Sequence, residues 1–310
     1  MKPKIGIVGA GNVGATIAHL CLMKGLGDIY MLDLNSDMAQ GKALDMSQSK
    51  YLFSSDITIE GGGDYEKITD CDYIIITAGL ARKPGMTRDD LLNKNFEIIK
   101  EVALKIKTSK KNPFVIVVSN PLDVMAYSVF KLTGFDKKKV IGMAGILDSY
   151  RFMHYLQQKI SVSGDNINTM ILGSHGDTMV PLLSKTLING KPASSLFPEA
   201  ELTTLANKAR NGGAEIVALL KTGSAYYAPA ASTVKMLDAI IYDRKITLPC
   251  SVFPDGAYGL TDLFIGLPVT LGNAGVEEIT DFKLTPEEQT ALEASAKAIK
   301  EQLAVIKDKF

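Results

Sequence analysis

The chain of 310 residues has no excess charge of either sign and no long hydrophobic run. Its 34 basic side chains balance 34 acidic ones, so it lacks the positive field that attracts nucleic acid or an anionic membrane. No run of about 18 apolar residues is present to span a bilayer. We therefore expect neither nucleic acid nor a membrane as partner, and an anionic ligand must be bound by locally placed cations.

Cysteine is also scarce. Cys21, Cys71 and Cys250 are odd in number, far apart and set among apolar residues, which favours buried free thiols in a reducing cytoplasm over a disulfide framework. The chain begins with two lysines and an apolar run, but glycines and the lack of a cleavage site argue against a signal peptide. C-x-x-C and H-E-x-x-H spacings are absent, so we expect no metal site. The free cysteines favour a cytoplasmic location.

The first 143 residues alternate short β-branched runs with longer segments of helical periodicity. The runs predicted to be strands are residues 4–10, 29–34, 56–61, 73–79, 114–120 and 139–144; the predicted helices include 12–25, 36–48, 89–109 and 121–134. Nearly continuous apolar strands indicate burial on both faces, hence a parallel sheet covered by helices. The pattern predicts an α/β fold with a doubly wound Rossmann sheet.

The pattern changes after residue 144 and predicts an α+β second domain. Helices are expected at residues 147–160, 199–221, 228–242 and 285–308, with a strand at 168–174. Segments 246–254 and 264–272 contain prolines, which suits antiparallel or edge strands better than a central parallel sheet. We therefore expect an NAD-binding domain at residues 1–143 and a substrate-binding, catalytic domain at residues 144–310.

A glycine-rich turn follows the first predicted strand and opens the first predicted helix. Gly9, Gly11 and Gly14 have the G-x-G-x-x-G spacing that allows a tight turn, close approach of a pyrophosphate and close helix–strand packing. Asp33 ends the second strand, where a carboxylate accepts from the adenosine ribose hydroxyls and repels a 2′-phosphate. This pattern predicts NAD rather than NADP, with loop contacts from Gly9, Ala10, Gly11, Asn12, Val13 and Gly14.

Three histidines are present, so a catalytic base can be sought by elimination. His19 and His154 lie in helical segments among apolar residues, and a structural role suits them better. His175 follows an apolar strand in "ILGSHGD", where small neighbours leave the approach open. A histidine titrating near neutrality can take a hydroxyl proton in one direction and return it in the other.

Such a base needs a carboxylate to fix its tautomer and ring angle. Asp148, Asp165 and Asp177 could serve, and sequence spacing alone does not choose among them. In "LDSYR", Asp148 and Arg151 are three residues apart and share one face of a helix. They form either a surface salt bridge or, beside a histidine, a fork for a planar carboxylate.

Five segments together carry a resemblance to a known family: "IGIVGAGNVG", "AGLARKPGMTRDDLL", "VSNPLDV", "LDSYRF" and "GSHGDTMVP". In this order and spacing they resemble the lactate/malate dehydrogenase family, more closely its lactate-dehydrogenase-like NAD-dependent malate dehydrogenases of bacteria. The resemblance runs from the first strand to beyond residue 230. It implies a homodimer or homotetramer and a dicarboxylate substrate, malate or oxaloacetate.

The resemblance also implies residue roles. His175 would exchange the proton with Asp148 holding its ring, and Arg151 would clamp the C1 carboxylate. Arg88 would polarise the ketone oxygen. Asn120 would contact both the substrate and the cofactor ribose. The residues that would line the nicotinamide half of the site are Asn95, Val118, Ser119 and Asn120.

The charged segment 79–90 decides the substrate in this interpretation. Arg82 matches the family position facing the far end of the substrate, where lactate dehydrogenases generally carry glutamine. A buried second carboxylate needs a cationic partner, so Arg82 favours malate over lactate. Lys83 is expected to stay in water, while Gly79 and Gly85 are candidate pivots of a lid.

Two alternatives remain at this stage. The chain could be an NAD-dependent dehydrogenase of lactate or another 2-hydroxy acid. From a different class, it could be a non-catalytic NAD-binding protein, which would predict gaps in the catalytic set. A short-chain dehydrogenase is not favoured, because no Tyr-x-x-x-Lys pair of that class stands in the right region of the sequence.

Overall fold

The structure, a computed structural model, describes residues 2–80 and 85–310. Six parallel strands form the first half of the main sheet, in the order β3-β2-β1-β4-β5-β6. The strands are β1 (Lys4–Val8), β2 (Asp28–Leu32), β3 (Ile59–Gly62), β4 (Tyr73–Ile76), β5 (Phe114–Val117) and β6 (Val140–Gly142). The chain direction across the sheet reverses between β1 and β4, which places a crevice at the carboxyl ends of these two strands.

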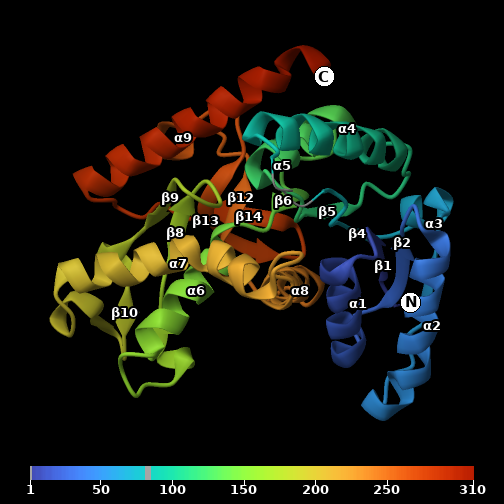
Figure 1. Cartoon of the computed structure of the whole chain (residues 1–310), viewed down its shortest axis with the longest axis horizontal. Helices are drawn as coiled ribbons and strands as arrows, with labels where there is room; N and C mark the ends of the chain where they lie inside the picture. Colours follow the sequence, from blue (N-terminus) through green and yellow to red (C-terminus); the bar gives the residue numbers. More distant parts are fainter. Residues whose placement is uncertain (1, 81–84) are drawn as a thin grey trace.

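Helices cover both faces of this sheet (Figure 1). In the first half they are α1 (Asn12–Lys24), α2 (Ser36–Ser49), α3 (Tyr65–Thr69), α4 (Arg88–Ile106) and α5 (Leu122–Thr133). The later helices are α6 (Gly145–Gln157), α7 (Glu199–Leu220), α8 (Tyr227–Ile241) and α9 (Pro286–Ile306). Helix α8 packs beside α1, whereas α9 packs against α4 and α5 on the other side of the strands.

The second half of the chain extends the same sheet with antiparallel strands. Strand β12 (Ile246–Val252) pairs with β6 through Ser251 and Gly142, and β13 (Ile265–Gly272) pairs with β12. Further out lie β8 (Ile171–Gly173), β9 (Met179–Pro181) and β14 (Gly275–Ile279). A second, small sheet holds β7 (Ile167–Asn168), β10 (Leu187–Ile188) and β11 (Lys191–Pro192).

Single 3-10 turns occur at η1 (Lys50–Phe53), η2 (Gly164–Asn166), η3 (Leu183–Lys185), η4 (Ala193–Ser195), η5 (Ala257–Gly259) and η6 (Lys307–Lys309).

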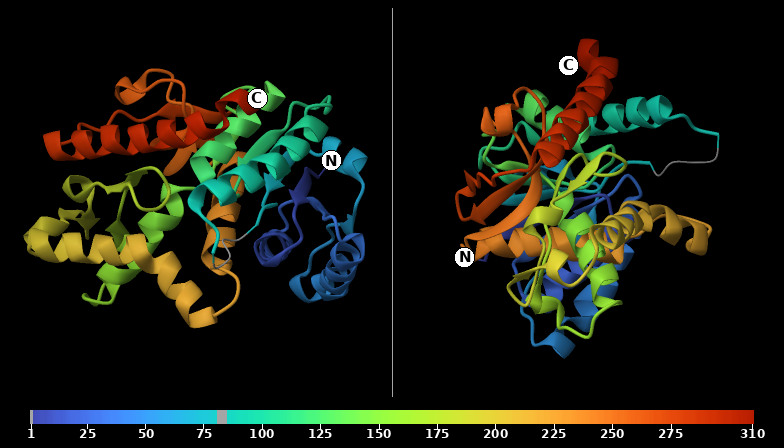
Figure 2. Two further views of the ribbon diagram at one scale, coloured as in Figure 1. Left: turned by 45° about the horizontal axis from the view of Figure 1, so that its top comes forward. Right: turned by 90° about the vertical axis from the view of Figure 1, so that its left-hand side faces the viewer.

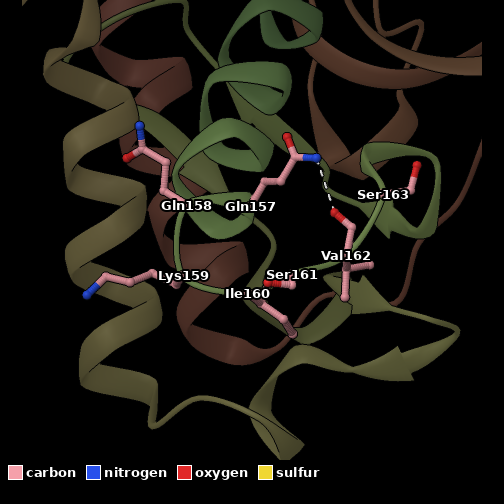
Figure 3. A pocket seen from close by; sticks show the side chains of 7 residues that line it. All are labelled: Gln157, Gln158, Lys159, Ile160, Ser161, Val162 and Ser163. Atoms are coloured by element: carbon pink, nitrogen blue, oxygen red, sulfur yellow. Dashed lines mark hydrogen bonds between the residues drawn. The ribbon is translucent and has the colours of Figure 1, made fainter.

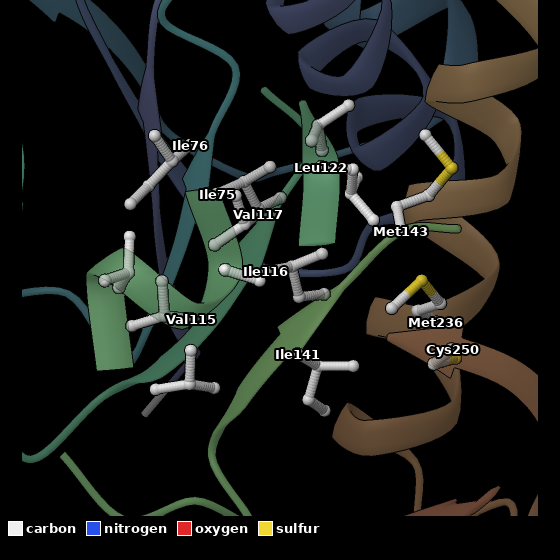
Figure 4. Packing of buried hydrophobic residues seen from close by; sticks show 14 of the residues in the cluster. Ile75, Ile76, Val115, Ile116, Val117, Leu122, Ile141, Met143, Met236 and Cys250 are labelled. Atoms are coloured by element: carbon white, nitrogen blue, oxygen red, sulfur yellow. The ribbon is translucent and has the colours of Figure 1, made fainter. Parts of the chain in front are cut away.

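One large hydrophobic core joins the two halves. Figure 4 shows Ile141 and Met143, at the end of the parallel strands, packed near Met236 of α8 and Cys250 of β12. A smaller core lies between α6 and α7, the two helices that stand together at the far end from the glycine-rich turn (Figure 2). All three cysteines are buried and free, and burial raises the pKa of the Cys21 thiol to about 12.

The sequence-based fold class is confirmed. The two proline segments were expected to be antiparallel strands or edge strands. They are antiparallel strands, but they lie inside the sheet and not at its edge. Pro249 and Pro268 face each other across β12 and β13. The carbonyl of Pro268 accepts from the Thr280 amide, so it points away from β12 and the proline removes no bond between these two strands.

Several small elements were not predicted, namely α3, β7, β9, β10, β11 and β14, which have at most five residues each. The domain boundary at residue 143 stays a prediction, because the main sheet runs through both halves. Across residues 2–80 and 85–310, no helix has the length and hydropathy needed to cross a membrane.

Candidate active site

The glycine-rich turn connects β1 to α1 at the crevice. A Cβ at Gly14 would lie 1.9 Å from the carbonyl oxygen of Gly9, so only glycine allows this helix–strand approach. Gly9 has φ +103°, and a Cβ there would lie 2.7 Å from Thr77 Oγ1. A Cβ at Gly11, in contrast, would meet no atom within 4 Å among the described residues. The turn is therefore closed toward the protein and open toward the crevice.

The first turn of α1 faces the same open space. Gly11 is its N-cap and makes no side-chain cap hydrogen bond, and no acidic side chain lies in the first turn. The first amides of a helix lack intrahelical partners, and the helix dipole adds partial positive charge there. This geometry fits an anionic pyrophosphate held at the first amides of α1 by the predicted residues Gly11, Asn12 and Val13. The predicted residue Ala10 is buried, and its amide donates to Asp33, so it shapes the turn instead.

Asp33 lies just past β2, beside the turn. Its Oδ2 accepts from the Ala10 amide at 2.7 Å and its Oδ1 accepts from the Asn35 amide at 3.0 Å. Lys42, which the sequence analysis did not single out, donates from Nζ to the Ala10 carbonyl at 2.7 Å. The carboxylate is thus fixed at the turn and half-buried, where it can accept from ribose hydroxyls.

Asn95 ties two loops of the crevice together. The residue is buried, and its amide bonds Leu80 at both backbone atoms, with Oδ1 accepting at 2.7 Å and Nδ2 donating at 3.1 Å. Nδ2 also donates to the carbonyl of Asn120 at 2.7 Å. The side chain of Asn95 is therefore occupied by the protein, and it shapes the loop on which Asn120 lies.

Residues 118–120 follow β5 at the same edge of the sheet. Val118 and Ser119 are nearly buried, and the Ser119 hydroxyl donates to the Ala78 carbonyl at 2.5 Å. Asn120 is exposed, so its side chain is free to reach a ligand in the crevice.

The proton-transfer candidates come together from two segments, helix α6 and the turn after β8. His175 Nδ1 lies 2.8 Å from Asp148 Oδ2, and Arg151 Nη1 lies 3.5 Å from Asp148 Oδ1. The carboxylate is buried, while both partners retain about one seventh of their side-chain exposure (15%). A carboxylate only accepts, so Nδ1 carries the hydrogen and Nε2 is left to exchange a proton with a ligand.

Among the described residues, the Nε of Arg151 is buried and has no hydrogen-bond partner. Gly212 and Gly213 of α7 lie beside the Arg151 side chain, and a Cβ on either would make an ordinary van der Waals contact with it at 3.5 Å. An unsatisfied buried donor is costly, and a bound carboxylate could accept two parallel bonds, one from Nε and one from a terminal nitrogen of the guanidinium.

The charges around His175 favour its protonated form. Burial alone lowers the pKa of His175, but the charge and hydrogen bond of Asp148 raise it more, so the pKa stands above its usual range. Arg151 lowers this pKa and Asp123 raises it further.

A second buried carboxylate, Asp123, lies behind the histidine. It accepts from the Ser174 hydroxyl at 2.9 Å, the His175 amide at 3.0 Å and the Ser251 hydroxyl at 2.7 Å. Sequence reasoning missed this residue, although it stands within the quoted segment "VSNPLDV". An acidic residue in the first turn of an otherwise apolar helix was the available signal.

Of the two arginines in segment 79–90, only Arg88 lies among the described residues. Arg88, at the start of α4, is exposed and pairs with Asp177 at 2.5 Å, two residues past the histidine. This pairing brings Arg88 to the same side of the crevice as His175. Arg82 and Lys83 lie outside the described residues.

The other candidates are not brought to the site. His19 packs its ring against Phe53 at 5.7 Å. His154 is exposed and contacts Gln158 at 3.0 Å, so of the core or interface role expected for it the core is excluded. Asp165 is exposed in η2. Of the three carboxylates left open, the structure therefore places Asp148 at the imidazole.

A separate hollow of about 450 Å³ lies beyond the end of α6. Figure 3 shows that residues 157–163 of one surface turn line it, with Gln157 Nε2 donating to the Val162 carbonyl at 3.1 Å. None of the predicted site residues is among them, so this hollow is not the candidate site.

Comparison with known proteins identifies the family of this chain. Residues 3–142 match the lactate/malate dehydrogenase NAD binding domain, and residues 146–309 match the lactate/malate dehydrogenase alpha/beta C-terminal domain. A malate dehydrogenase of Rhodopirellula baltica is 48% identical over 301 residues, covering 96% of each chain.

Solved structures show the same architecture. The apo malate dehydrogenase from Picrophilus torridus is 39% identical with a TM-score of 0.96, covering 99% of this chain and 98% of that one. The lactate dehydrogenase from Cryptosporidium parvum, solved with lactic acid and NAD, is 36% identical with a TM-score of 0.95, covering 99% and 98%. Overall shape therefore does not separate the two activities.

Proposed function

The chain belongs to the lactate/malate dehydrogenase family of NAD-dependent oxidoreductases, and on that premise we propose that it is a malate dehydrogenase. The reaction is (S)-malate + NAD⁺ ⇌ oxaloacetate + NADH + H⁺. The observation that carries this proposal is the arrangement of His175, Asp148 and Arg151, in which one buried carboxylate orients both a proton-transfer ring and a carboxylate clamp.

In this proposal the residues divide the work as follows. Arg151 holds the C1 carboxylate of the substrate by a bidentate pair, which orients the hydroxyl toward His175 Nε2. His175 takes the hydroxyl proton in oxidation and returns it in reduction, while Asp148 fixes the tautomer and stabilises the imidazolium. Arg88 and Asn120 hydrogen-bond the reacting oxygen, for which Arg88 must leave Asp177.

The cofactor is NAD, which accepts or donates a hydride when bound. Gly9, Gly11 and Gly14 with the amides of α1 would hold its pyrophosphate, and Asp33 its adenosine ribose. Val118, Ser119 and Asn120 would border the nicotinamide half. Because its side chain already bonds Leu80 and Asn120, we propose that Asn95 acts there through the backbone it holds.

Malate is preferred over lactate in this proposal for two reasons. The Rhodopirellula baltica relative is named a malate dehydrogenase, and the sequence has Arg82 where the resemblance implies the side chain facing the far end of the substrate. A cation there neutralises a second carboxylate, and it would be left unpaired beside the methyl group of pyruvate.

We also propose a homo-oligomer in the cytoplasm. Two large apolar side chains of η1, Tyr51 and Leu52, are 76% and 84% exposed, which suits burial against a second copy. The buried free thiols suit a reducing compartment.

The test compares turnover of oxaloacetate and pyruvate with NADH and with NADPH. We expect oxaloacetate with NADH to give the highest kcat/KM. Arg82→Gln should lower kcat/KM for oxaloacetate by about 10²-fold, because a charge-assisted contact is lost. Lys83→Gln is the matched control and should leave it unchanged. Pyruvate as the better substrate of the unaltered protein would overturn the assignment.

A further inference from the structure

Asp123 occupies an unusual place, a fully buried carboxylate in the first turn of α5 that every neighbour approaches as a donor. Oδ2 accepts from the hydroxyl of Ser174 and the amide of His175, at 2.9 and 3.0 Å. Oδ1 accepts from the hydroxyl of Ser251, in β12, at 2.7 Å. One side chain thus joins α5, the central strand β12 and the turn that carries the proposed base.

The turn itself has little regular structure to hold it. Strands β8 and β9 on either side have three residues each, and residues 174–178 between them form no strand. Besides Asp123, the turn is held at its start by Ser295 of α9, whose buried hydroxyl accepts from the Ser174 amide at 2.7 Å. Both anchors act on the main chain or on Ser174, and neither contacts the imidazole.

The charge of Asp123 also bears on the imidazole. Burial is the largest influence and raises the pKa of the Asp123 carboxyl above its ordinary value, while the hydrogen bonds from Ser251, Ser174 and the His175 amide oppose this rise without cancelling it. The His175 amide can only donate, and the N-terminus of α5 adds partial positive charge, so these contacts favour the carboxylate.

We propose that Asp123 is a positioning residue that, as a carboxylate, fixes the His175 turn and adds a second negative charge behind the imidazole. It does not touch the ligand. Other charged groups around His175 are Asp148 and Arg151 of α6 and, two residues along the turn, Asp177, which pairs with Arg88 of α4 in this structure. The groups presented by β12 and α9, Ser251 and Ser295, are uncharged.

This inference rests on the proposed role of His175, and two variants separate position from charge. Asp123→Asn can keep an oxygen toward the His175 amide and turn its NH₂ toward Ser251 Oγ, which can accept. It removes the charge but retains the anchor. Asp123→Ala removes both, and leaves the Ser174 and Ser251 hydroxyls and the His175 amide without this acceptor.

The measurement is kcat and KM for oxaloacetate against pH, per active site counted by NADH fluorescence titration. For Asp123→Asn we expect kcat within about tenfold of the unaltered enzyme and a shift of the kinetic histidine pKa to lower pH. For Asp123→Ala we expect kcat to fall by about 10²-fold, as for a misplaced catalytic group, with NADH affinity retained. Ser128→Ala, another buried polar change on α5, is the control and should match the unaltered enzyme.

A pH profile of Asp123→Asn that superimposes on the unaltered one would overturn the inference, as would full kcat in Asp123→Ala. Equal loss of NADH-binding sites and activity in Asp123→Ala would also overturn it, because that result indicates a folding role. These outcomes leave the proposed function standing. That proposal fails separately if His175→Asn keeps its turnover or the unaltered protein does not reduce oxaloacetate.

Discussion

Asp148→Asn is the sharpest test of the catalytic geometry, because one carboxylate faces two donors. Oδ2 is 2.8 Å from the imidazole and Oδ1 is 3.5 Å from the guanidinium of Arg151. An asparagine has one acceptor and one donor end, so it can satisfy only one of them. If its oxygen faces Arg151, its NH₂ faces Nδ1, which places the ring hydrogen on Nε2, where the proton must be received.

The magnitude follows from charge and distance. A carboxylate and an imidazolium whose centres are about 4 Å apart interact by about 4 kcal/mol at an effective dielectric constant near 20, and the Asp148→Asn variant would lose this stabilisation of the imidazolium. An Asp-to-Asn change beside a catalytic histidine costs about 10⁴ in kcat when it inverts the tautomer. We therefore expect kcat/KM for oxaloacetate to fall by on the order of 10³–10⁴, with NADH binding retained.

The assay is NADH oxidation at 340 nm, with NADH affinity measured by fluorescence. Asp165→Asn is the matched control, since this exposed aspartate has no contact with the site. More than one tenth of the unaltered turnover in Asp148→Asn would refute the reasoning. A parallel loss of NADH affinity would show instead that the change damages the fold.

Four further predictions can be checked by kinetics, NADH fluorescence and unfolding measurements. The raised pKa of His175 predicts that oxaloacetate reduction, which needs the imidazolium, declines above the ordinary value of 6.5, while malate oxidation rises over the same interval; a midpoint at or below 6.5 would contradict this. The same shift contributes folding stability that is complete below pH 6.5 and lost as the pH rises through the folded-state pKa, which denaturant titrations across pH would detect. Gly14→Ala should destabilise the fold by about 1–3 kcal/mol through its clash with the Gly9 carbonyl, whereas Gly11→Ala should keep its stability and weaken NADH binding, as melting curves and fluorescence would show. Thr285→Ala removes the cap of α9 and should cost about 1 kcal/mol in chemical denaturation without changing KM; an unchanged midpoint would argue against the cap.

Interactions between residues close in the chain allowed many elements of this protein to be predicted from its sequence. The strands of the parallel sheet are buried on both faces and read as short apolar runs, and the glycines of the β1–α1 turn were recognisable because backbone geometry demands them. The long helices were found within a few residues, since their caps and periodicity are local signals. His175 was found because few histidines compete with it.

Other features depend on contacts between distant segments, which sequence spacing does not encode. The choice of Asp148 over Asp165 and Asp177 required the packing of α6 against β8, which brings residues 27 positions apart to 2.8 Å. Asp123 and Ser251 are 128 positions apart and meet only because β12 joins the sheet beside β6. The sequence determined which chemical groups are available, and the tertiary structure decided which of them share a buried environment, because burial and hydrogen bonding depend on neighbours in space and not in the chain.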